Sequence, residues 1–283
     1  MEEEQQQGSV RYIPIQEHPL WGTALRYREN FLPAEVARSL VDEARQGTAN
    51  RRRKLWQDGT RLGRMVASFT FPESLESISY YEAKIQPIQE WPTLRAAFDL
   101  ASQQLDEWLP VGFVPRQPNY VLANWYSSPL ANARWHQDVP EPIADWIFSI
   151  SLGAARMFYL QAMSTGGAGT DFEPNNPVYY ISLPPNSALL MGPGINSTHI
   201  HCIPPCQDEK EEKEEAEKEE ATNREDGKEE TAYQRNELKQ VDDEDARDGA
   251  SAPEDQAHAN SPPPHARFTG PRLNLTFRYV IPF

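Results

Sequence analysis

The chain has 283 residues, 39% of them hydrophobic, which is enough to bury the core of one large domain or two small ones. Its two cysteines, Cys202 and Cys206, are too few for the disulfide framework of a small secreted protein. A formal net charge of −15 at pH 7 would exclude most nucleic-acid partners if it were spread evenly, because a phosphate backbone is bound through Lys and Arg.

Residues 1–26 are interpreted as an N-terminal extension. Their first residues, MEEEQQQ, lack the basic start and apolar run of a secretory signal and the Arg-rich composition of a transit peptide. No apolar run in the chain approaches membrane-spanning length. We therefore expect an intracellular protein, in the nucleus, the cytoplasm or both, that has no membrane partner.

Two amphipathic helices are predicted before residue 110. The first spans Pro33–Gln46, where apolar residues recur at helical spacing, proline occupies the first turn and Gly47 follows the end. The second spans Pro92–Trp108, and Pro110 stops its pattern. These helices are expected to support a larger structure.

Charge is distributed unevenly along the chain. Residues 208–255 contain 21 acidic and 8 basic residues, a net of −13, whereas the rest has 21 acidic and 19 basic residues, a net of −2. Outside the acidic segment, Arg51–Lys54, Arg61 and Arg64 form a basic cluster. This cluster is either a surface for an anionic substrate or an ordinary solvated loop, and the sequence leaves both open.

From Tyr120 onward the chain consists of short aliphatic and aromatic runs separated by Pro, Gly, Asn and Ser. Seven runs are predicted to be strands: YVLANWY, WIFSISLG, RMFYLQA, VYYISL, SALLMG, THIHCI and LNLTFRYVI. Helices followed by many short strands indicate an α+β protein with an antiparallel sandwich or jelly roll and helices on one outer face.

Residues 207–266 interrupt this pattern. The segment is rich in Glu and Lys, then in Asp, and ends in SPPPH, with few apolar residues to bury. Such a composition does not offset the entropy of ordering, so we expect a disordered acidic insertion between two strands of one sheet. A domain accepts such a loop because the cost of loop closure grows slowly with length.

A possible metal site begins with His136 and Asp138, which point to the same face if they lie on one strand. His201 downstream would complete two imidazoles and one carboxylate, the facial triad that leaves positions of an Fe(II) ion open. His199 shares the predicted face of His201 and competes with it. An isolated strand histidine is more often a core residue, and a zinc site with Cys202, Cys206 and these histidines is disfavoured because its ligands are crowded.

The final strand separates polar from apolar residues by alternation. One face carries Arg272, Asn274, Thr276 and Arg278. The other carries Leu273, Leu275, Phe277 and Tyr279. The two arginines lie roughly 20 Å apart along an extended strand, so two long side chains leaning inward could grip a short dicarboxylate, whose ends match arginine forks.

The motifs LANWY, WHQD, SISLG, HIHCIPP and RLNLTFR, in this order, resemble those of the AlkB family of Fe(II)- and 2-oxoglutarate-dependent dioxygenases. The resemblance covers residues 27–206 and 267–283. It implies a single dioxygenase domain over 27–283 with a double-stranded β-helix (jelly roll) core. It also implies Fe(II), 2-oxoglutarate and O2 as cofactor and co-substrates.

The resemblance assigns roles position by position. His136, Asp138 and His201 match the iron ligands. The residues that match the binding site of 2-oxoglutarate are Arg272, Tyr126 and Asn274 at the distal carboxylate and Arg278 and Asn124 near the metal-chelating end. The substrate candidates are Arg64, Tyr81, Trp135 and Glu141.

The resemblance implies oxidative demethylation of N-alkylated bases, with single-stranded DNA, RNA or a flipped base as partner. Repair enzymes of the family often carry an acidic residue two places after the HxD aspartate, where this chain has Pro140, followed by Glu141. This departure leaves a protein or small-molecule substrate open. A non-catalytic binding module and a scaffold that binds basic partners through its acidic insertion are further alternatives, and we expect a monomer.

Overall fold

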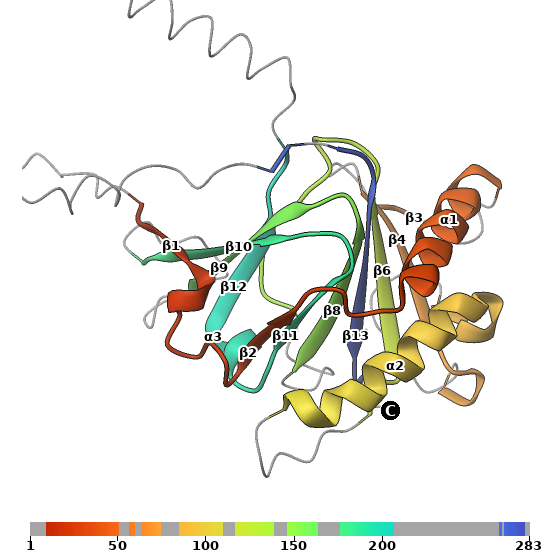
Figure 1. Ribbon diagram of the computed structural model, residues 1–283, viewed down its shortest axis with the longest axis horizontal. Coiled ribbons are helices and arrows are strands. Elements are labelled where there is room, and N and C mark those ends of the chain that lie inside the picture. Colours follow the sequence, from red (N-terminus) through yellow and green to blue (C-terminus); the bar gives the residue numbers. More distant parts are fainter. Residues whose placement is uncertain are drawn as a thin grey trace, which may run out of the picture.

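The computed structural model describes residues 10–50, 57–59, 64–74, 85–109, 117–138, 146–163, 176–206, 266–267 and 269–280. Two β-sheets face each other, and helices α1 (Ala34–Asn50) and α2 (Pro92–Trp108) cover the outer face of the larger one (Figure 1). The predicted insertion at 207–266 lies outside the described residues except for its last one. No described helix has the length and apolar character to cross a membrane.

Within the described part of the chain, the smaller sheet has five strands and the larger has eight. The smaller has the order β1 (Tyr12–Pro14), β10 (Val178–Leu183), β9 (Arg156–Ala162), β12 (His199–Ile203) and β7 (Ala133–His136). The larger has the order β2 (Leu25–Arg28), β11 (Ser187–Met191), β8 (Ile147–Gly153), β13 (Arg272–Arg278), β6 (Tyr120–Tyr126), β4 (Arg64–Thr70) and β3 (Gln57–Gly59), and β5 (Ile85–Pro87) pairs with β4. This is the jelly roll that the sequence predicts.

Short helices connect some of these strands. They are the 3-10 helices η1 (Ile15–Glu17), η2 (Pro72–Ser74) and η3 (Ile88–Glu90) and the one-turn helix α3 (Ile195–Thr198), which leads directly into β12. All seven predicted strands are present. Helix α1 continues past Gly47 to Asn50, so its predicted end is wrong. Glycine permits the left-handed turn that ends a helix but does not impose it.

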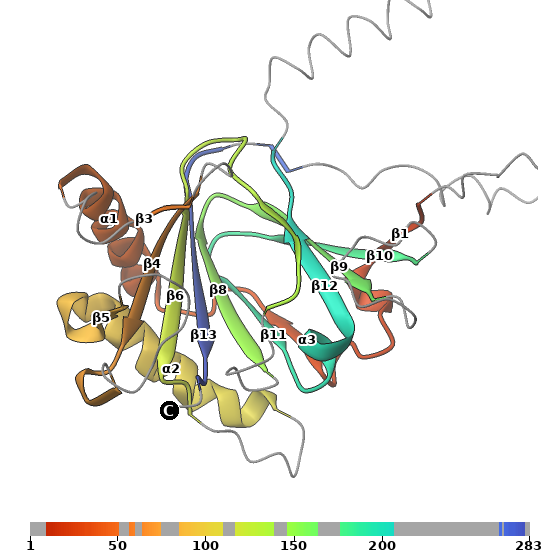
Figure 2. The same ribbon diagram turned by 180° about the vertical axis from the view of Figure 1, so that it is seen from behind.

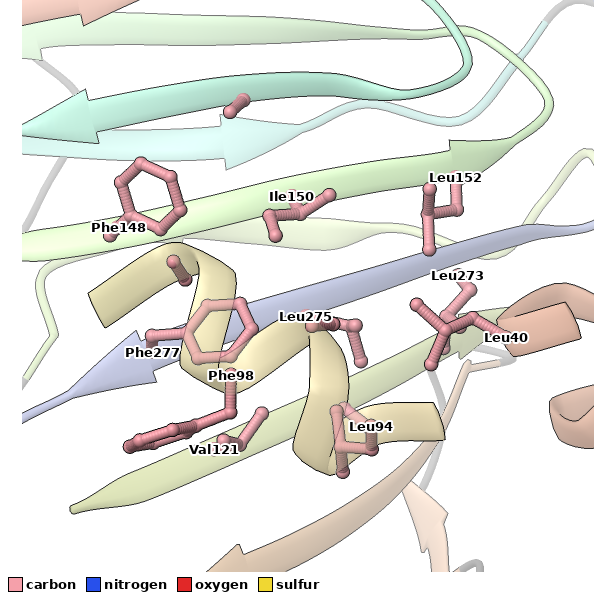
Figure 3. Close-up of a cluster of buried hydrophobic side chains, with 14 of the residues drawn as sticks. Leu40, Leu94, Phe98, Val121, Phe148, Ile150, Leu152, Leu273, Leu275 and Phe277 are labelled. Atoms are coloured by element: carbon pink, nitrogen blue, oxygen red, sulfur yellow. The ribbon is translucent and has the colours of Figure 1, made fainter. Parts of the chain in front are cut away.

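The main core lies between the larger sheet and the two helices. Figure 3 shows residues of β13, β8 and β6 packed against α1 and α2: Leu273, Leu275, Phe277, Phe148, Ile150, Leu152, Val121, Leu40, Leu94 and Phe98. Apart from Phe98, which is 5% exposed, none of them exceeds 3% exposure. Because the apolar face of β13 is used here, its polar residues face the space between the two sheets.

The N-terminal segment belongs to both sheets. β1 pairs with β10 in parallel, and β2 pairs with β11 in antiparallel. Between them, Ile15 is completely buried in a second core that lies between the sheets. The sequence-based boundary after residue 26 therefore falls inside β2, and the described part of the predicted extension is an integral part of the fold.

Candidate metal centre

The inner face of the larger sheet presents polar residues in rows, because directly paired strand residues share a face. One row, across β4, β6 and β13, contains Arg64, Tyr126 and Arg272. The next row, across β6, β13 and β8, contains Asn124, Asn274 and Ser151. The structure thus places Arg272, Tyr126 and Asn274, predicted to lie at the distal carboxylate, beside Asn124, predicted to lie nearer the metal-chelating end.

Across the space between the sheets, His136, Asp138 and His201 form a candidate metal site. Their ligand atoms all lie within 4.8 Å of one another. His201 of β12 is paired with His136 of β7, and the two rings have centroids 4.3 Å apart. Asp138 follows the end of β7, and its Oδ2 lies 3.8 Å from His201 Nε2. Among the described residues this is the one such group of three.

The protonation states suit metal binding. Burial lowers the pKa of His136 and lowers that of His201 to about 3, so both imidazoles are neutral at pH 7. Burial alone would raise the pKa of Asp138, but Arg278 and the two imidazoles hold it below its usual range. Two neutral imidazoles and one carboxylate are the donor set that Fe(II) takes in a facial triad.

Neighbouring groups fix the orientation of each donor. His136 Nδ1–H donates to the main-chain oxygen of Arg134 at 2.7 Å, which leaves Nε2 free to bind a metal. The His201 ring stacks on Phe158 with a centroid distance of 5.6 Å. Arg278 Nη2 donates to Asp138 Oδ1 at 2.7 Å. The free atoms of the three side chains therefore face one point, and the residues fit Fe(II).

Arg272 has the geometry of an anchor for a carboxylate. Arg272 is 1% exposed, and its Nη2 donates to Ser151 Oγ at 2.8 Å, whereas Nε and Nη1 have no hydrogen-bond partner within the described part of the chain. The guanidinium lies 5.1 Å from the ring centroid of Tyr126. Burial lowers the pKa of Arg272 to about 10, so it is still a cation at pH 7. Buried N–H groups of a cation that lack an acceptor are available to a carboxylate such as that of 2-oxoglutarate.

His199 is engaged elsewhere. The Leu20 N–H donates to His18 Nδ1 at 3.1 Å, so His18 Nε2 carries the proton and donates to His199 Nε2 at 3.2 Å. His199 Nδ1–H then donates to Thr198 Oγ1 at 2.7 Å. Both ring nitrogens of His199 are thus used in hydrogen bonds, which favours His201 as the third metal ligand.

This pairing predicts the effect of a substitution outside the metal site. His18→Leu is expected to lower the free energy of unfolding by about 1–3 kcal/mol, because His199 Nε2 is then buried without a partner. Replacing both histidines by leucine should recover part of the loss, since no unpaired polar group remains. Urea denaturation measures both. If His199→Leu alone prevented Mn(II) binding, His199 would be a ligand after all.

The substrate candidates are placed differently. Arg64 lies on the inner face close enough to lower the pKa of both His136 and His201. Trp135 points to the outer face of the smaller sheet, where it packs against Tyr159. Tyr81 and Glu141 lie outside the described residues. Their roles in substrate binding stay predictions.

The predicted assignment missed three residues that support the site: Ser151, Gln137 and Asn196. Ser151 lies within the motif SISLG, in a strand whose other residues are mostly apolar, but neither feature assigned it a role at the site. Gln137 and Asn196 hold the main chain around Asp138 by hydrogen bonds. No sequence pattern marks these two, because their contacts join segments about 60 residues apart.

One protein-family model matches most of the chain. Residues 24–278 match the 2OG-Fe(II) oxygenase superfamily. No curated protein matches the chain. A solved structure titled "The structure of OsALKBH1" is similar over 90% of this chain and 98% of that chain, with 14% identity and a TM-score of 0.46. With the superfamily match spanning most of its length, the chain belongs to the 2OG-Fe(II) oxygenases, and Fe(II), 2-oxoglutarate and O2 are its cofactor and co-substrates.

Proposed function

We propose that this dioxygenase removes N-methyl groups from bases in nucleic acid. The proposal is supported by the AlkB-like motifs around the triad and by a cation, Arg64, on the inner face of the larger sheet. Iron, 2-oxoglutarate and O2 supply the oxidising power. Oxidation of the N-methyl carbon releases formaldehyde, and succinate and CO2 are the products of the co-substrate.

Each group of residues in the site has its own proposed role. His136, Asp138 and His201 would hold the iron. Arg272, with Tyr126 and Asn274 beside it, would bind the distal carboxylate of 2-oxoglutarate. Arg278 and Asn124 would lie at the metal-chelating end, where Arg278 already holds Asp138 Oδ1.

The position of Arg64 is the observation that supports nucleic acid as the substrate. It is half-buried and sits in the row of Tyr126 and Arg272, and its side chain has no hydrogen-bond or ion-pair partner among the described residues. An arginine in this position, next to the reacting centre, would attract an anionic substrate such as a nucleotide phosphate.

A formaldehyde-release screen tests the proposal. Alkylated single-stranded DNA, duplex DNA and RNA are compared, with His136→Ala as the blank. Release from one of the three, absent with His136→Ala, is the expected result. If none releases formaldehyde while 2-oxoglutarate turnover persists, the substrate is a protein side chain or a small molecule.

Replacing Arg64 tests its role directly. Arg64→Ala is expected to lower kcat/KM on the nucleic acid about ten-fold and to reduce the slope of log K against log salt by about 1, because one phosphate contact is lost. The matched control is Arg38→Ala, which removes an exposed arginine of α1 on the outer side of the larger sheet. Equal effects of the two substitutions would show that Arg64 contributes only to net charge.

The partners follow from the same proposal. The enzyme would act as a monomer on single-stranded nucleic acid or on a flipped base, and the segment 207–266 would recruit basic partners. Deleting residues 207–265 should then leave turnover unchanged and weaken only the binding of basic proteins. Loss of turnover would show that the segment belongs to the catalytic domain.

A further inference from the structure

Asp138 lies two residues beyond the end of β7, where no ladder hydrogen bonds hold the main chain. The ladder between β7 and β12 pairs His136 with His201, and β7 ends at His136. Gln137 and Asp138 belong to no described strand. A metal ligand beyond the end of a strand needs another source of order, because its main chain is not fixed by ladder hydrogen bonds.

Two hydrogen bonds supply that order. Asn196 Nδ2 donates to the main-chain oxygen of Asp138 at 3.1 Å, and Gln137 Nε2 donates to the main-chain oxygen of Asn196 at 2.7 Å. Each segment thus holds the main chain of the other through a side-chain amide. Asn196 is 2% exposed, and a buried hydrogen bond is electrostatically stronger than one in water.

The helix that carries Asn196 is itself firmly placed. Ile195 is completely buried in the core between the sheets, and the Thr198 hydroxyl donates to the main-chain oxygen of Gly194. Gly194 enters the helix with φ of 86°, a conformation that favours glycine. Figure 2 shows α3 at the start of β12, the strand that carries His201. One continuous segment therefore provides His201 and holds Asp138.

We propose that Asn196 is a positioning residue for the metal centre, which fixes the Asp138 carboxylate relative to His201 through its hydrogen bond to the Asp138 main chain. Gln137 makes the reciprocal hydrogen bond to the main chain of Asn196, and the two hydrogen bonds together are called the clamp. The inference rests on the proposed function, because it takes His136, Asp138 and His201 as the metal ligands.

Mn(II) binding in the presence of 2-oxoglutarate tests the clamp without catalysis. Mn(II) suits a site of imidazole and carboxylate, and its binding is followed by electron paramagnetic resonance. Asn196→Ala and Asn196→Asp are expected to raise the Kd of Mn(II) about 10- to 100-fold, the usual cost of losing a group that orients a ligand. Asn196→Asp has the same shape as asparagine, but its carboxylate cannot donate to the Asp138 oxygen.

Asn186 offers a matched control. Its side chain makes the same two-sided contact with another segment: Nδ2 donates to the Leu32 oxygen at 2.8 Å, and the Leu32 N–H donates to Oδ1 at 2.9 Å. Asn186 has φ of 61°, so glycine is the substitution that removes the amide without strain. Asn186→Gly should lower the melting temperature of the metal-free protein and leave the Kd of Mn(II) within about three-fold of wild type, a margin of under 1 kcal/mol.

The possible outcomes distinguish a failure of the clamp from a failure of the metal-ligand assignment. If the wild type binds Mn(II) and both Asn196 variants bind it equally well, the clamp is overturned and the metal site stands. If Asn186→Gly weakens binding as much as Asn196→Ala, the effect is one of general stability, and the clamp is again overturned. A wild type that fails to bind Mn(II) overturns the ligand assignment, and the clamp with it.

Discussion

Asp138→Ala is expected to have two effects, loss of turnover and loss of stability without metal. Turnover of 2-oxoglutarate should fall at least about 1,000-fold, because metal-ion catalysis contributes several kcal/mol to the barrier. The metal-free protein should lose about 3–5 kcal/mol of its free energy of unfolding, because the buried Arg278 cation loses its carboxylate. The two side chains are each 3% exposed, and Arg278 Nη2 lies 2.7 Å from Asp138 Oδ1.

A double substitution tests whether the loss of stability comes from the unpaired Arg278 charge or from lost packing. Arg278→Met combined with Asp138→Ala removes both charges, and it should be more stable than Asp138→Ala alone. Succinate formation measures turnover, and urea denaturation after metal chelation measures stability. If Asp138→Ala were as stable as wild type, the ion pair would contribute nothing to the fold. If succinate formation persisted, Asp138 would not be a ligand.

The last strand shows what could be predicted from sequence alone. Alternation over Arg272–Arg278 places every second residue on one face, and the structure buries Leu273, Leu275 and Phe277 against the helices. The strand pairs with β6 and β8 at its two edges, while α1 and α2 cover its apolar face and its polar face points to the space between the sheets. Local periodicity therefore determined the face on which the arginines lie.

The first two metal ligands meet for a different reason than alternation. Alternation predicts that His136 and Asp138 share one face of a single strand, but β7 ends at His136, and its register with β12 shifts between His201 and Ile203. Asp138 reaches the site through contacts with Asn196 and Arg278, which are 58 and 140 residues away. Such contacts depend on the tertiary fold, and one sequence does not reveal them.

The N-terminal segment escaped prediction for a similar reason. β1 and β2 have three and four residues, too few for a clear period of two. They exist because β10 and β11, more than 150 residues later, provide edges for pairing. The partner of His199, His18, lies in this segment, so the spacing of residues alone did not decide between His199 and His201, and only the motif match favoured His201.

Arg272→Lys is expected to weaken the binding of 2-oxoglutarate about 30-fold or more. Disrupting one partner of a buried, hydrogen-bonded charge pair costs at least about 2 kcal/mol, and every 1.4 kcal/mol is ten-fold. Lysine keeps the charge but lacks the planar fork with which arginine binds a carboxylate. The Kd of 2-oxoglutarate, measured with Mn(II) in place of Fe(II), reports this loss without catalysis.

Arg156 is the control for a buried cation at the same end of the site. It is as buried as Arg272 and lies 5.9 Å from the Tyr126 ring centroid, but it donates to the main-chain oxygens of Ser128 and Pro129. Arg156→Lys should therefore lower the melting temperature and change the Kd of 2-oxoglutarate less than about three-fold, which is under 1 kcal/mol.

A 2-oxo acid without the second carboxylate gives the sharper test of Arg272. Pyruvate has the metal-chelating end of 2-oxoglutarate but nothing for a distal arginine to bind, so Arg272→Lys should leave its weak binding unchanged. The preference of the wild type for 2-oxoglutarate over pyruvate should then shrink by the same factor by which the Kd of 2-oxoglutarate rises. Equal weakening of both acids would mean that Arg272 acts on the metal-chelating end or on the fold, and that the distal carboxylate is bound elsewhere.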